Sequence, residues 1–475
     1  MDRMNEKYEI IIGLEVHVEL ATETKIFCSC PTKFGAEPNT HCCPVCMGLP
    51  GALPVLNEKV IELAVRAGIA TNCMVAERSY HDRKNYFYPD LPKGYQISQF
   101  KRPLCTNGYV EVNGKRIGIT QIHIEEDAGK LIHTDDGKTL IDLNRAGIPL
   151  IEIVSAPDIR SANEAVEYLK TLRLMLIYAG VSECKMNEGQ LRCDVNLSVR
   201  KRGEKLFGVR TEMKNINSFA FVAKAIEYEA ARQIEILEGG GQIDRETRKF
   251  DSDKGITLSL RKKEEAADYR FFRDPDLPTI EILSDAVDKI KVTMPRLPNE
   301  RYVEYTQKYA LTDSDADALI SEPSLSEYFE SVAVISHSPK ISANLILSEL
   351  LSQSVPERLS ADFPAVSVAA ISNMFFSELI NSSTVKKLLR RVLTEGIDPI
   401  ETVNAESLMQ INDVAVLEAA VNDALHECAK SVSDYKNGKT NAKKAIMGKA
   451  MVKCNGKGNP RIIEELLRKA LDGDC

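Results

Sequence analysis

Apolar and polar residues alternate with the two-residue period of a β-strand over much of residues 8–290. The clearest case is TNGYVEVNGKRIGITQIHIEED, where Asn113-Gly114 separates two alternating runs. Asn-Gly is a preferred pair for a type I′ turn, because both central residues of that turn need a positive φ. The pattern therefore predicts a β-hairpin here, within a body that is rich in strands.

Two segments of this body change to the helical period. The first follows Ser161, has Glu164 three residues later as a capping box, and stops at Gly180. The second follows Ser218 and ends at the glycine run 239–241. Their apolar stripes predict two helices that pack on the core of the body.

The pattern changes again near Pro295, after which it is helical to the end of the chain. A second break lies at residues 396–399, and short helical segments follow it. We therefore expect an α+β body with a mixed or antiparallel sheet, then an all-α middle domain and a small helical tail domain. The expected bounds are 1–294, 295–400 and 401–475.

Composition agrees with an ordinary globular chain, since 44% of the 475 residues are hydrophobic and 27% are charged. The N-terminus lacks the apolar stretch of a signal peptide. No apolar run reaches the roughly 18 residues that a membrane span needs. We therefore expect a cytoplasmic protein without a membrane partner.

The net charge of −8 is unevenly distributed, because residues 430–475 hold eleven Lys and Arg against five Asp and Glu. A basic tail on an acidic chain indicates binding to a polyanion, whose counterions would be released. A solvated basic helix face explains the same composition, and charge alone leaves both interpretations open. Within the tail, Lys436, Lys439 and Lys443 keep a spacing that predicts one helix face.

Four of the twelve cysteines form two close pairs, which are Cys28 with Cys30 and Cys43 with Cys46. Two thiolate pairs a dozen residues apart can occupy the corners of a tetrahedron, which predicts a structural zinc site in a knuckle over residues 28–46. Cys42, or less readily His41, could replace a neighbour as ligand. The alternative is four reduced cysteines in a partly buried loop.

Acidic residues and one histidine share a strand face in the segment GLEVHVEL. The strand period puts Glu15, His17 and Glu19 on one side and apolar residues on the other. Carboxylates and a histidine on strands suit a hard divalent ion such as Mg²⁺ that bridges substrate phosphates. We interpret Glu19 as an ordinary exposed or ion-paired residue rather than as a ligand.

Two further segments add carboxylates. QIHIEEDAGK supplies His123, Glu125, Glu126 and Asp127, of which we interpret Asp127 as structural. In a regular strand Glu125 faces the same way as His123 and Glu126 the opposite way, and only a bulge would bring both inward. Glu152 stands alone in the apolar run IPLIEIV, where an unpaired carboxylate is costly to bury, so we assign it to function.

DRKNYFYPDLPKGYQISQ is a loop by its prolines and glycine, and functional residues often lie on loops. Lys84 and Lys93 are candidate partners for phosphate or carboxylate groups, and Tyr86 and Tyr88 could stack or donate hydrogen bonds. The sequence has no G-x-x-x-x-G-K-[ST] segment, so any use of a nucleotide is not of the P-loop type.

Together these segments resemble the B subunit of the tRNA-dependent amidotransferases, which act on aspartyl- and glutamyl-tRNA(Asn/Gln). The matching stretches are IGLEVHVEL, FGAEPNT, DRKNYFYPDLPKGYQISQ, IEEDAGK, PLIEIVSAPDIRS, EGQLRCDVNLSVR, TEMKNINSF and EEAADYRFFRDPDLP. They span most of residues 8–280. The C-terminal TNAKKAIMGKAMVKCNGKGNP resembles the tail domain of the same family, so the resemblance covers essentially the full length.

The resemblance implies a carbon–nitrogen ligase with a cradle-like catalytic body. ATP and Mg²⁺ would serve to phosphorylate the side-chain carboxylate of a misacylated Glu-tRNA(Gln) or Asp-tRNA(Asn), and ammonia would then displace phosphate. The ammonia would be freed by a separate amidase (A) subunit, with glutamine as a donor, and a small C subunit would hold the heterotrimer together. Which of the two tRNAs is used stays open.

The resemblance also implies roles for single residues. The magnesium ligands would be Glu15, His17, Glu126 and Glu152, with Glu125 as an alternative to Glu126. Lys84 and Tyr86 would lie on the ammonia path or the substrate approach. Support of the metal or contact with the nucleotide would come from Asp194, Glu212 and Lys214. Contacts of the tail with tRNA would come from Lys436, Lys439, Lys443, Lys444 and Lys449.

Two other functions explain part of the pattern. A non-catalytic tRNA-binding scaffold would account for the tail and the cysteines, but not for Glu152 or for the pairing of Glu15 with His17. A metal-dependent hydrolase would use the same carboxylates and would turn over without ATP.

Overall fold

The computed structural model describes residues 7–262 and 268–472, so the start of the EEAADYRFFRDPDLP segment lies outside the described residues. The chain divides into two compact units, Met1–Pro298 and Asn299–Cys475. The first unit carries the strands and the second is helical, which confirms the expected fold class. The expected domain bounds stay predictions.

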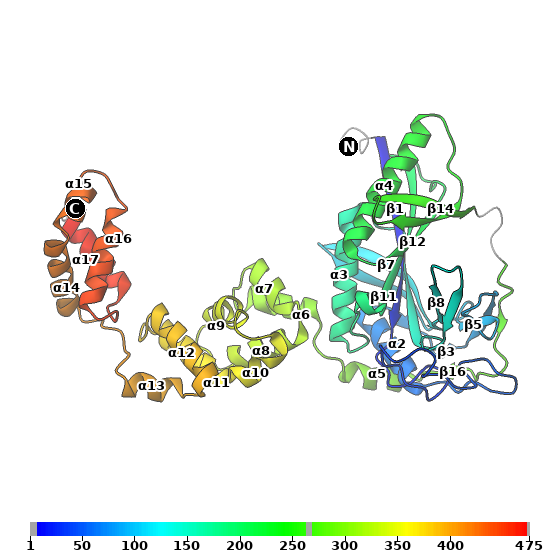
Figure 1. Ribbon diagram of the computed structural model, residues 1–475, viewed down its shortest axis with the longest axis horizontal. Helices are drawn as coiled ribbons and strands as arrows, with labels where there is room; N and C mark the ends of the chain where they lie inside the picture. Colours follow the sequence, from blue (N-terminus) through cyan, green and yellow to red (C-terminus); the bar gives the residue numbers. More distant parts are fainter. Residues whose placement is uncertain (1–6, 263–267, 473–475) are drawn as a thin grey trace. The chain divides into compact units, whose positions relative to one another are not determined.

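The first unit is built on a nine-stranded sheet (Figure 1), in the order β14-β13-β12-β11-β1-β10-β7-β6-β2. Neighbouring strands are antiparallel except β12 and β13, which pair in parallel. The strands are β1 (Tyr8–Glu19), β2 (Met74–Val75), β6 (Cys105–Val112), β7 (Lys115–Glu126), β10 (Pro149–Ser155), β11 (Leu191–Lys201), β12 (Thr211–Ile216), β13 (Glu246–Asp251) and β14 (Ile256–Lys262).

Three small sheets complete the strand content of the described part of this unit. Their strand orders are β15-β4-β5, β16-β3 and β8-β9. Their bounds are β3 (Arg78–Ser79), β4 (Asp82–Asn85), β5 (Tyr95–Ser98), β8 (Lys130–His133), β9 (Thr139–Asp142), β15 (Phe272–Arg273) and β16 (Ile280–Glu281).

The predicted hairpin is formed by β6 and β7, and its turn residues Asn113 and Gly114 have φ values of 50° and 76°. Both predicted helices are also present, as α3 (Ala162–Tyr178) and α4 (Phe219–Glu238). The hydroxyl of Ser161 accepts from the N–H of Glu164, as a capping box requires. The reciprocal bond differs, because the Glu164 carboxylate accepts from the N–H of Arg160 and not from that of Ser161.

The core lies between one face of the large sheet and the helices α2 (Glu58–Ala70), α3 and α4. On the central strand, Leu14, Val16 and Val18 point into this core and are at most 1% exposed. The alternate residues of β1 therefore point to the opposite face of the sheet. The remaining helical elements of this unit are η1 (Met186–Glu188) and α5 (Ser284–Val292).

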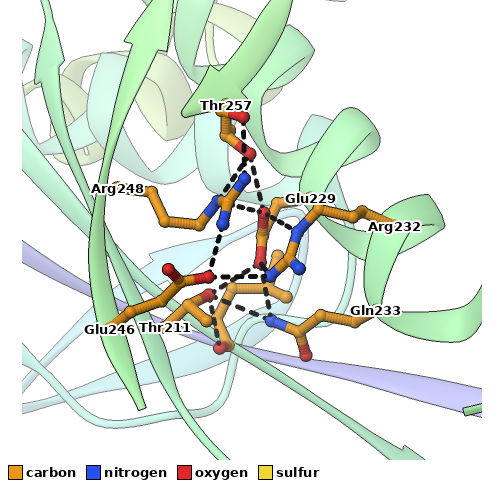
Figure 2. A network of polar contacts seen from close by, with 8 residues as sticks. Thr211, Glu229, Arg232, Gln233, Glu246, Arg248 and Thr257 are labelled. Atoms are coloured by element: carbon orange, nitrogen blue, oxygen red, sulfur yellow. Dashed lines mark hydrogen bonds and ion pairs between the residues drawn. The ribbon is translucent and has the colours of Figure 1, made fainter. Parts of the chain in front are cut away.

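A buried polar network joins α4 to one end of the sheet (Figure 2). The carboxylate of Glu229, which is fully buried, accepts from Arg232 at 2.6 and 2.9 Å and from the hydroxyl of Thr257 at 2.8 Å. Arg248 lies 3.2 Å from the same carboxylate. Thr211, Gln233 and Glu246 complete the network. It ties β12, β13 and β14 to the helix that covers them.

The second unit contains the helical elements α6 (from Pro298 to Gln307), α7 (Asp313–Ile320), α8 (Pro323–Ala333), α9 (Pro339–Leu345), η2 (Ile346–Leu350), η3 (Pro356–Arg358), α10 (Leu359–Asp362), α11 (Ala365–Phe376), α12 (Ser382–Glu395), α13 (Pro399–Ala405), α14 (Val414–Glu427), α15 (Ala429–Lys436), α16 (Ala442–Lys453) and α17 (Pro460–Asp472). A separate small core joins α14, α16 and α17. The expected boundary near residue 400 stays a prediction.

Among the described residues, no single helix is both long and apolar enough to cross a membrane. One pair, Pro356–Asp362 with Ala365–Phe376, reaches those limits only together and is bent by 80° between its members.

Candidate active site

Polar side chains from five neighbouring strands meet on the face of the sheet that is turned away from the helices. The register brings His17 opposite Glu152, and Glu152 opposite His123. On the other side of β1, Glu15 lies opposite Asp194. The strand alternation that buries Leu14, Val16 and Val18 is therefore also what gathers these groups on one surface.

The centre of this surface is a cluster of His17, Glu125 and Glu152. The Nε2 atom of His17 lies 3.3 Å from Glu125 Oε1 and 3.4 Å from Glu152 Oε2. His123 Nε2 lies 3.2 Å from the same oxygen of Glu152. The second oxygen of Glu125 is buried and has no hydrogen-bond partner among the described residues.

The pKa values of the cluster are shifted because two carboxylates surround the imidazole of His17. Burial alone would lower the pKa of His17, but hydrogen bonds to Glu125 and Glu152 raise it to about 10. Burial would raise the pKa of Glu152, yet His123 and His17 hold it well below its usual value. The raised pKa of His17 and the lowered pKa of Glu152 thus have one cause, the close contact of imidazole and carboxylate groups in the cluster.

These residues fit a divalent cation. One atom each from His17, Glu125 and Glu152 lies within 4.8 Å of the others, and the free oxygen of Glu125 is an acceptor that lacks a donor. Oxygen donors with one imidazole are a set that Mg²⁺ or Mn²⁺ accepts. A bound ion would displace the proton of His17.

Glu126 does not belong to this cluster. Its carboxylate accepts from Lys93 Nζ at 2.5 and 2.6 Å and from the N–H of Ile97 at 2.8 Å. The pairing of β7 with β10 is regular from Glu126 to Gln121, so no bulge turns both glutamates inward. The structure therefore brings Glu125, and not Glu126, to His17 and Glu152, which corrects the grouping expected with Glu126.

A second acidic group lies beside the cluster, formed by Glu15, Asp194 and Glu212. Lys214 Nζ bonds to the carboxylate of Asp194 and lies 2.9 Å from that of Glu212. Burial, and then Glu152, raise the pKa of Glu15. The structure thus brings Asp194, Glu212 and Lys214 together beside Glu15, with Lys214 as the cation between the two carboxylates. Their expected role in support of the metal or in nucleotide contact stays a prediction.

Sequence reasoning missed Asn196, whose side-chain amide donates to Glu15 Oε1 at 2.8 Å. The residue lines a cavity of about 210 Å³ together with Gly13, Glu15, Phe207 and Arg210. The available signal was the strand period, since Asn196 lies two residues after Asp194 on β11. The cavity itself had no local signal, because its walls come from segments far apart in the chain.

Lys84 and Tyr86 lie close to the cluster, at the small sheet formed by β4 and β5. The Tyr86 hydroxyl donates to Gln96 Oε1 at 3.2 Å, and Gln96 donates to the backbone carbonyl of Glu126 at 2.7 Å. Burial and then Glu125 raise the pKa of Tyr86. The pKa of Glu125 is lowered, because His17 and then the ammonium of Lys84 outweigh the effect of burial. Lys84 and Tyr86 therefore border the cluster.

Glu19 and Asp127, interpreted as structural from the sequence, lie further along the same face. Asp127 is paired with Arg192 at 2.7 Å and with Arg145 at 3.4 Å. Burial, and then the charge of Asp127, raise the pKa of Glu19 to about 7. The ion pairs of Asp127 agree with the structural interpretation.

The four cysteines of the expected knuckle lie together. The Sγ atoms of Cys28, Cys30, Cys43 and Cys46 all lie within 4.8 Å of one another. The Cys43 and Cys46 sulfurs are 3.9 Å apart, close to the edge of about 3.8 Å that a tetrahedron with Zn–S bonds of about 2.3 Å requires. Cys42 lies outside this group and faces Asn144. The donor set and its geometry fit zinc.

The tail lysines do not share one helix face. α15 ends at Lys436, Gly438 takes a φ of 91°, and α16 begins at Ala442. The predicted face through Lys436, Lys439 and Lys443 is therefore wrong, because a turn containing glycine separates the two helices.

Several tail cations are balanced within the chain. Lys443 lies 3.1 Å from Glu464, and Lys449 lies 2.9 Å from Glu427. Lys439 pairs with Asp434 at 3.0 Å. In the described part of the tail, Lys436 and Lys444 have no ion pair. The five lysines of the expected tRNA contact therefore lie on two helices and the turn between them.

Known proteins match this chain over nearly all of its length. Residues 10–288 match the GatB/GatE catalytic domain and residues 327–471 the GatB domain. The B subunit of the aspartyl/glutamyl-tRNA(Asn/Gln) amidotransferase from Caldicellulosiruptor saccharolyticus is 49% identical over 98% of this chain and 99% of its own. The B subunits from Carboxydothermus hydrogenoformans and Geotalea uraniireducens are each 48% identical over 98% of this chain, with 99% and 100% of their own lengths covered.

The first unit, whose sheet carries the cluster of His17, Glu125 and Glu152, is thus a catalytic domain of the GatB/GatE class. Within that class, the chain belongs to the family of aspartyl/glutamyl-tRNA(Asn/Gln) amidotransferase B subunits.

Proposed function

We propose that this chain activates the side-chain carboxylate of a misacylated tRNA with ATP and then forms the amide with ammonia. The observation that carries the proposal is the partly buried cluster of His17, Glu125 and Glu152, in which a buried oxygen of Glu125 accepts no hydrogen bond. The relatives are named as amidotransferases of aspartyl/glutamyl-tRNA(Asn/Gln), which supports the choice of substrate.

The reaction consists of two displacements. A carboxylate oxygen of the substrate attacks the γ-phosphorus of ATP, the bond to the bridging oxygen breaks, and ADP leaves. Ammonia then attacks the acyl carbon and loses a proton, and inorganic phosphate leaves with the former carboxylate oxygen. Amide formation becomes feasible because phosphate is a much better leaving group than oxide.

His17, Glu125 and Glu152 would hold Mg²⁺, with Glu15 beside them. The ion would neutralise charge on the phosphoryl oxygens of ATP. The residues of the chain have to position two anions, the carboxylate and the triphosphate, on a face that is itself acidic. Cations beside the acidic groups are therefore needed, and the proposal uses Lys84 and Lys214.

The proposal gives each of these lysines a task. Lys84, which lies close enough to influence the charge state of Glu125, would meet the substrate carboxylate or the incoming ammonia together with Tyr86. Lys214, held by Asp194 and Glu212, would contact the nucleotide. Glu126 would not bind the ion, because its carboxylate is occupied by Lys93 and Ile97.

We also propose a structural zinc at the four cysteines, a site with no open position for catalysis. Elemental analysis of purified protein would detect it. An amidase subunit and a small third subunit would complete the enzyme, since the names of the relatives describe one subunit of a larger assembly. The cytoplasm, where thiols stay reduced, is the proposed location.

The test is Glu152→Ala in the assembled complex. We expect loss of ATP-dependent amide formation on misacylated tRNA, while glutamine hydrolysis by the partner subunit continues. Normal amide formation by this variant would refute the proposal. Omitting the nucleotide from the wild-type reaction separates it from a simple hydrolase, which would continue to turn over.

A further inference from the structure

A row of aromatic rings leads away from the catalytic cluster. It starts at Tyr86 beside Glu125 and continues through Tyr269 and Phe271 to Phe100. Successive ring centroids are 6.1, 5.9 and 4.2 Å apart. We call these four residues the aromatic row.

The outer end of the row is a flat, accessible surface. Phe100 and Phe271 are stacked with an angle of 8° between their planes, so one face of the Phe100 ring is covered. Phe100 is nevertheless 56% exposed, and this exposure is large for a phenylalanine that already stacks on another ring. A planar group can therefore add to the stack on the free face of Phe100.

The row is fixed to the strand that carries the catalytic glutamate. Ile97 of β5 donates its N–H to Glu126, and the side chain of Gln99 accepts from the N–H of Ile124 at 3.0 Å. The backbone of Phe100 is held in turn by Asp82, which accepts its N–H at 2.9 Å. Asn85 donates to the carbonyl of Tyr269 at 2.9 Å and so holds the other segment. The row and Glu125 thus belong to one framework.

Cations accompany the rings. Lys84 Nζ lies 5.3 Å from the centroid of Tyr269 and 5.9 Å from that of Tyr86. Lys101 follows Phe100, and Arg270 lies between Tyr269 and Phe271, both with exposed side chains. In the described residues none of these three cations has an ion pair. Three of the four rings are half-buried, and Phe100 is the exposed one. Unpaired cations beside an exposed ring that ends such a row are a combination that binds single-stranded nucleic acid.

We infer that the aromatic row binds the unpaired 3′ end of the aminoacyl-tRNA, with bases stacked on Phe100 and phosphates near Lys101 and Arg270. The inference rests on the proposed function, because the amino acid is esterified to the terminal ribose of that strand. Its carboxylate can reach the cluster only if the strand ends next to Tyr86. Successive nucleotides rise by about 3.4 Å along a stacked strand, so the row spans a few of them.

A protein partner is the competing occupant of this surface. The unpaired cations favour the nucleic acid, since a protein interface core is usually depleted of free charges. The two occupants also make different predictions for the same variant. Loss of the rings weakens tRNA binding in one case and subunit assembly in the other.

The experiment uses the assembled complex and a misacylated tRNA that carries 2-aminopurine a few nucleotides before its terminal adenosine, at the position that the length of the row brings to Phe100. With wild-type protein we expect the 2-aminopurine fluorescence to be quenched on binding, because the base stacks. In Phe100→Ala this quenching is lost and KM for the tRNA rises about 10-fold, since one stacked base contributes a factor of this order. The rate at saturating tRNA is retained.

Three controls make the result specific. Phe100→Trp keeps a stacking surface and should restore quenching and KM. Phe376→Ala removes a comparably exposed ring, 53% against 56%, from the helical unit and should change neither. Lys101→Ala should lower the slope of log affinity against log salt by about 1.

Unchanged quenching and KM in Phe100→Ala would overturn the inference, and so would release of the amidase subunit from that variant. The proposed function is tested separately by Glu152→Ala. A wild-type complex that quenches 2-aminopurine but forms no amide would refute the function and leave the binding site standing.

Discussion

At the residue scale, the alternation of side chains along β7 decides which glutamate reaches His17. Glu125 shares the face of His123, whereas Glu126 points to Lys93 on the other side of the strand. The sequence alone could state this alternation, but the pairing of Glu126 with Lys93 depends on a loop that is 33 residues away. Local patterns therefore predicted the direction of both side chains and not the partner of Glu126.

Glu125→Gln and Glu126→Gln form a matched pair. Glu125→Gln should abolish amidation and raise the Mg²⁺ concentration needed for half-maximal activity beyond the accessible range, because it removes a charged ligand. Glu126→Gln should keep the Mg²⁺ requirement and lose at most about 10-fold in rate, since it only loosens the strand next to Glu125. A Mg²⁺ titration of both variants measures this, and the reverse order of effects would contradict the assignment.

His81 provides a pH-dependent prediction that is independent of the cluster. Burial lowers the pKa of His81 to about 4, and neither ring nitrogen has a hydrogen-bond partner among the described residues. The unfolded chain takes up a proton near pH 6.5 that the folded chain does not, so stability is lost as pH falls from about 6.5 towards 4.

Between pH 7 and pH 5 this single group should lower the free energy of unfolding by about 2 kcal/mol. His81→Phe should remove that part of the slope, because phenylalanine keeps the ring and its edge contact with Phe27 but cannot be protonated. Urea unfolding at the two pH values measures the difference. An equal slope in the variant would show that His81 is not the group responsible.

At the element scale, capping residues and apolar periods were sufficient for α3, α4 and the β6–β7 hairpin, because their signals are local. The order of the strands in the sheet could not be predicted from the sequence. β1 lies between β10 and β11, more than a hundred residues further along, and no turn signal records that pairing. The break between α15 and α16 was not predicted for another reason. The spacing of the lysines indicated one continuous helix, although Gly438 lies between them.

At the same scale, the buried polar network around Glu229 holds α4 on the strands β12, β13 and β14. Glu229→Ala should lower the free energy of unfolding by about 3–5 kcal/mol, because it leaves Arg232 and Arg248 without their buried carboxylate. Glu238→Ala, also on α4, removes only an exposed ion pair with Lys7 and should leave the free energy of unfolding nearly unchanged. Urea unfolding compares the two, and similar losses would contradict this account.

At the scale of the whole molecule, the proposed function gives one tRNA two contacts, with the sheet face of the first unit and with the basic tail. Removing the residues after 402 should weaken tRNA binding and reduce its salt dependence, because phosphate contacts are lost. ATP-dependent chemistry on the first unit should persist at raised tRNA concentration. Filter binding at several salt concentrations measures the slope, and an unchanged affinity would exclude the tail from binding.

The central claim, that the carboxylate is phosphorylated on the face around His17, Glu125 and Glu152, is tested most directly with labelled oxygen. Misacylated tRNA whose side-chain carboxylate carries ¹⁸O is incubated with ATP, glutamine and the assembled complex, and the inorganic phosphate is analysed by mass spectrometry. The account predicts one ¹⁸O atom in each phosphate released with the amide, and neither product with Glu152→Gln. Amide formation with unlabelled phosphate would contradict it.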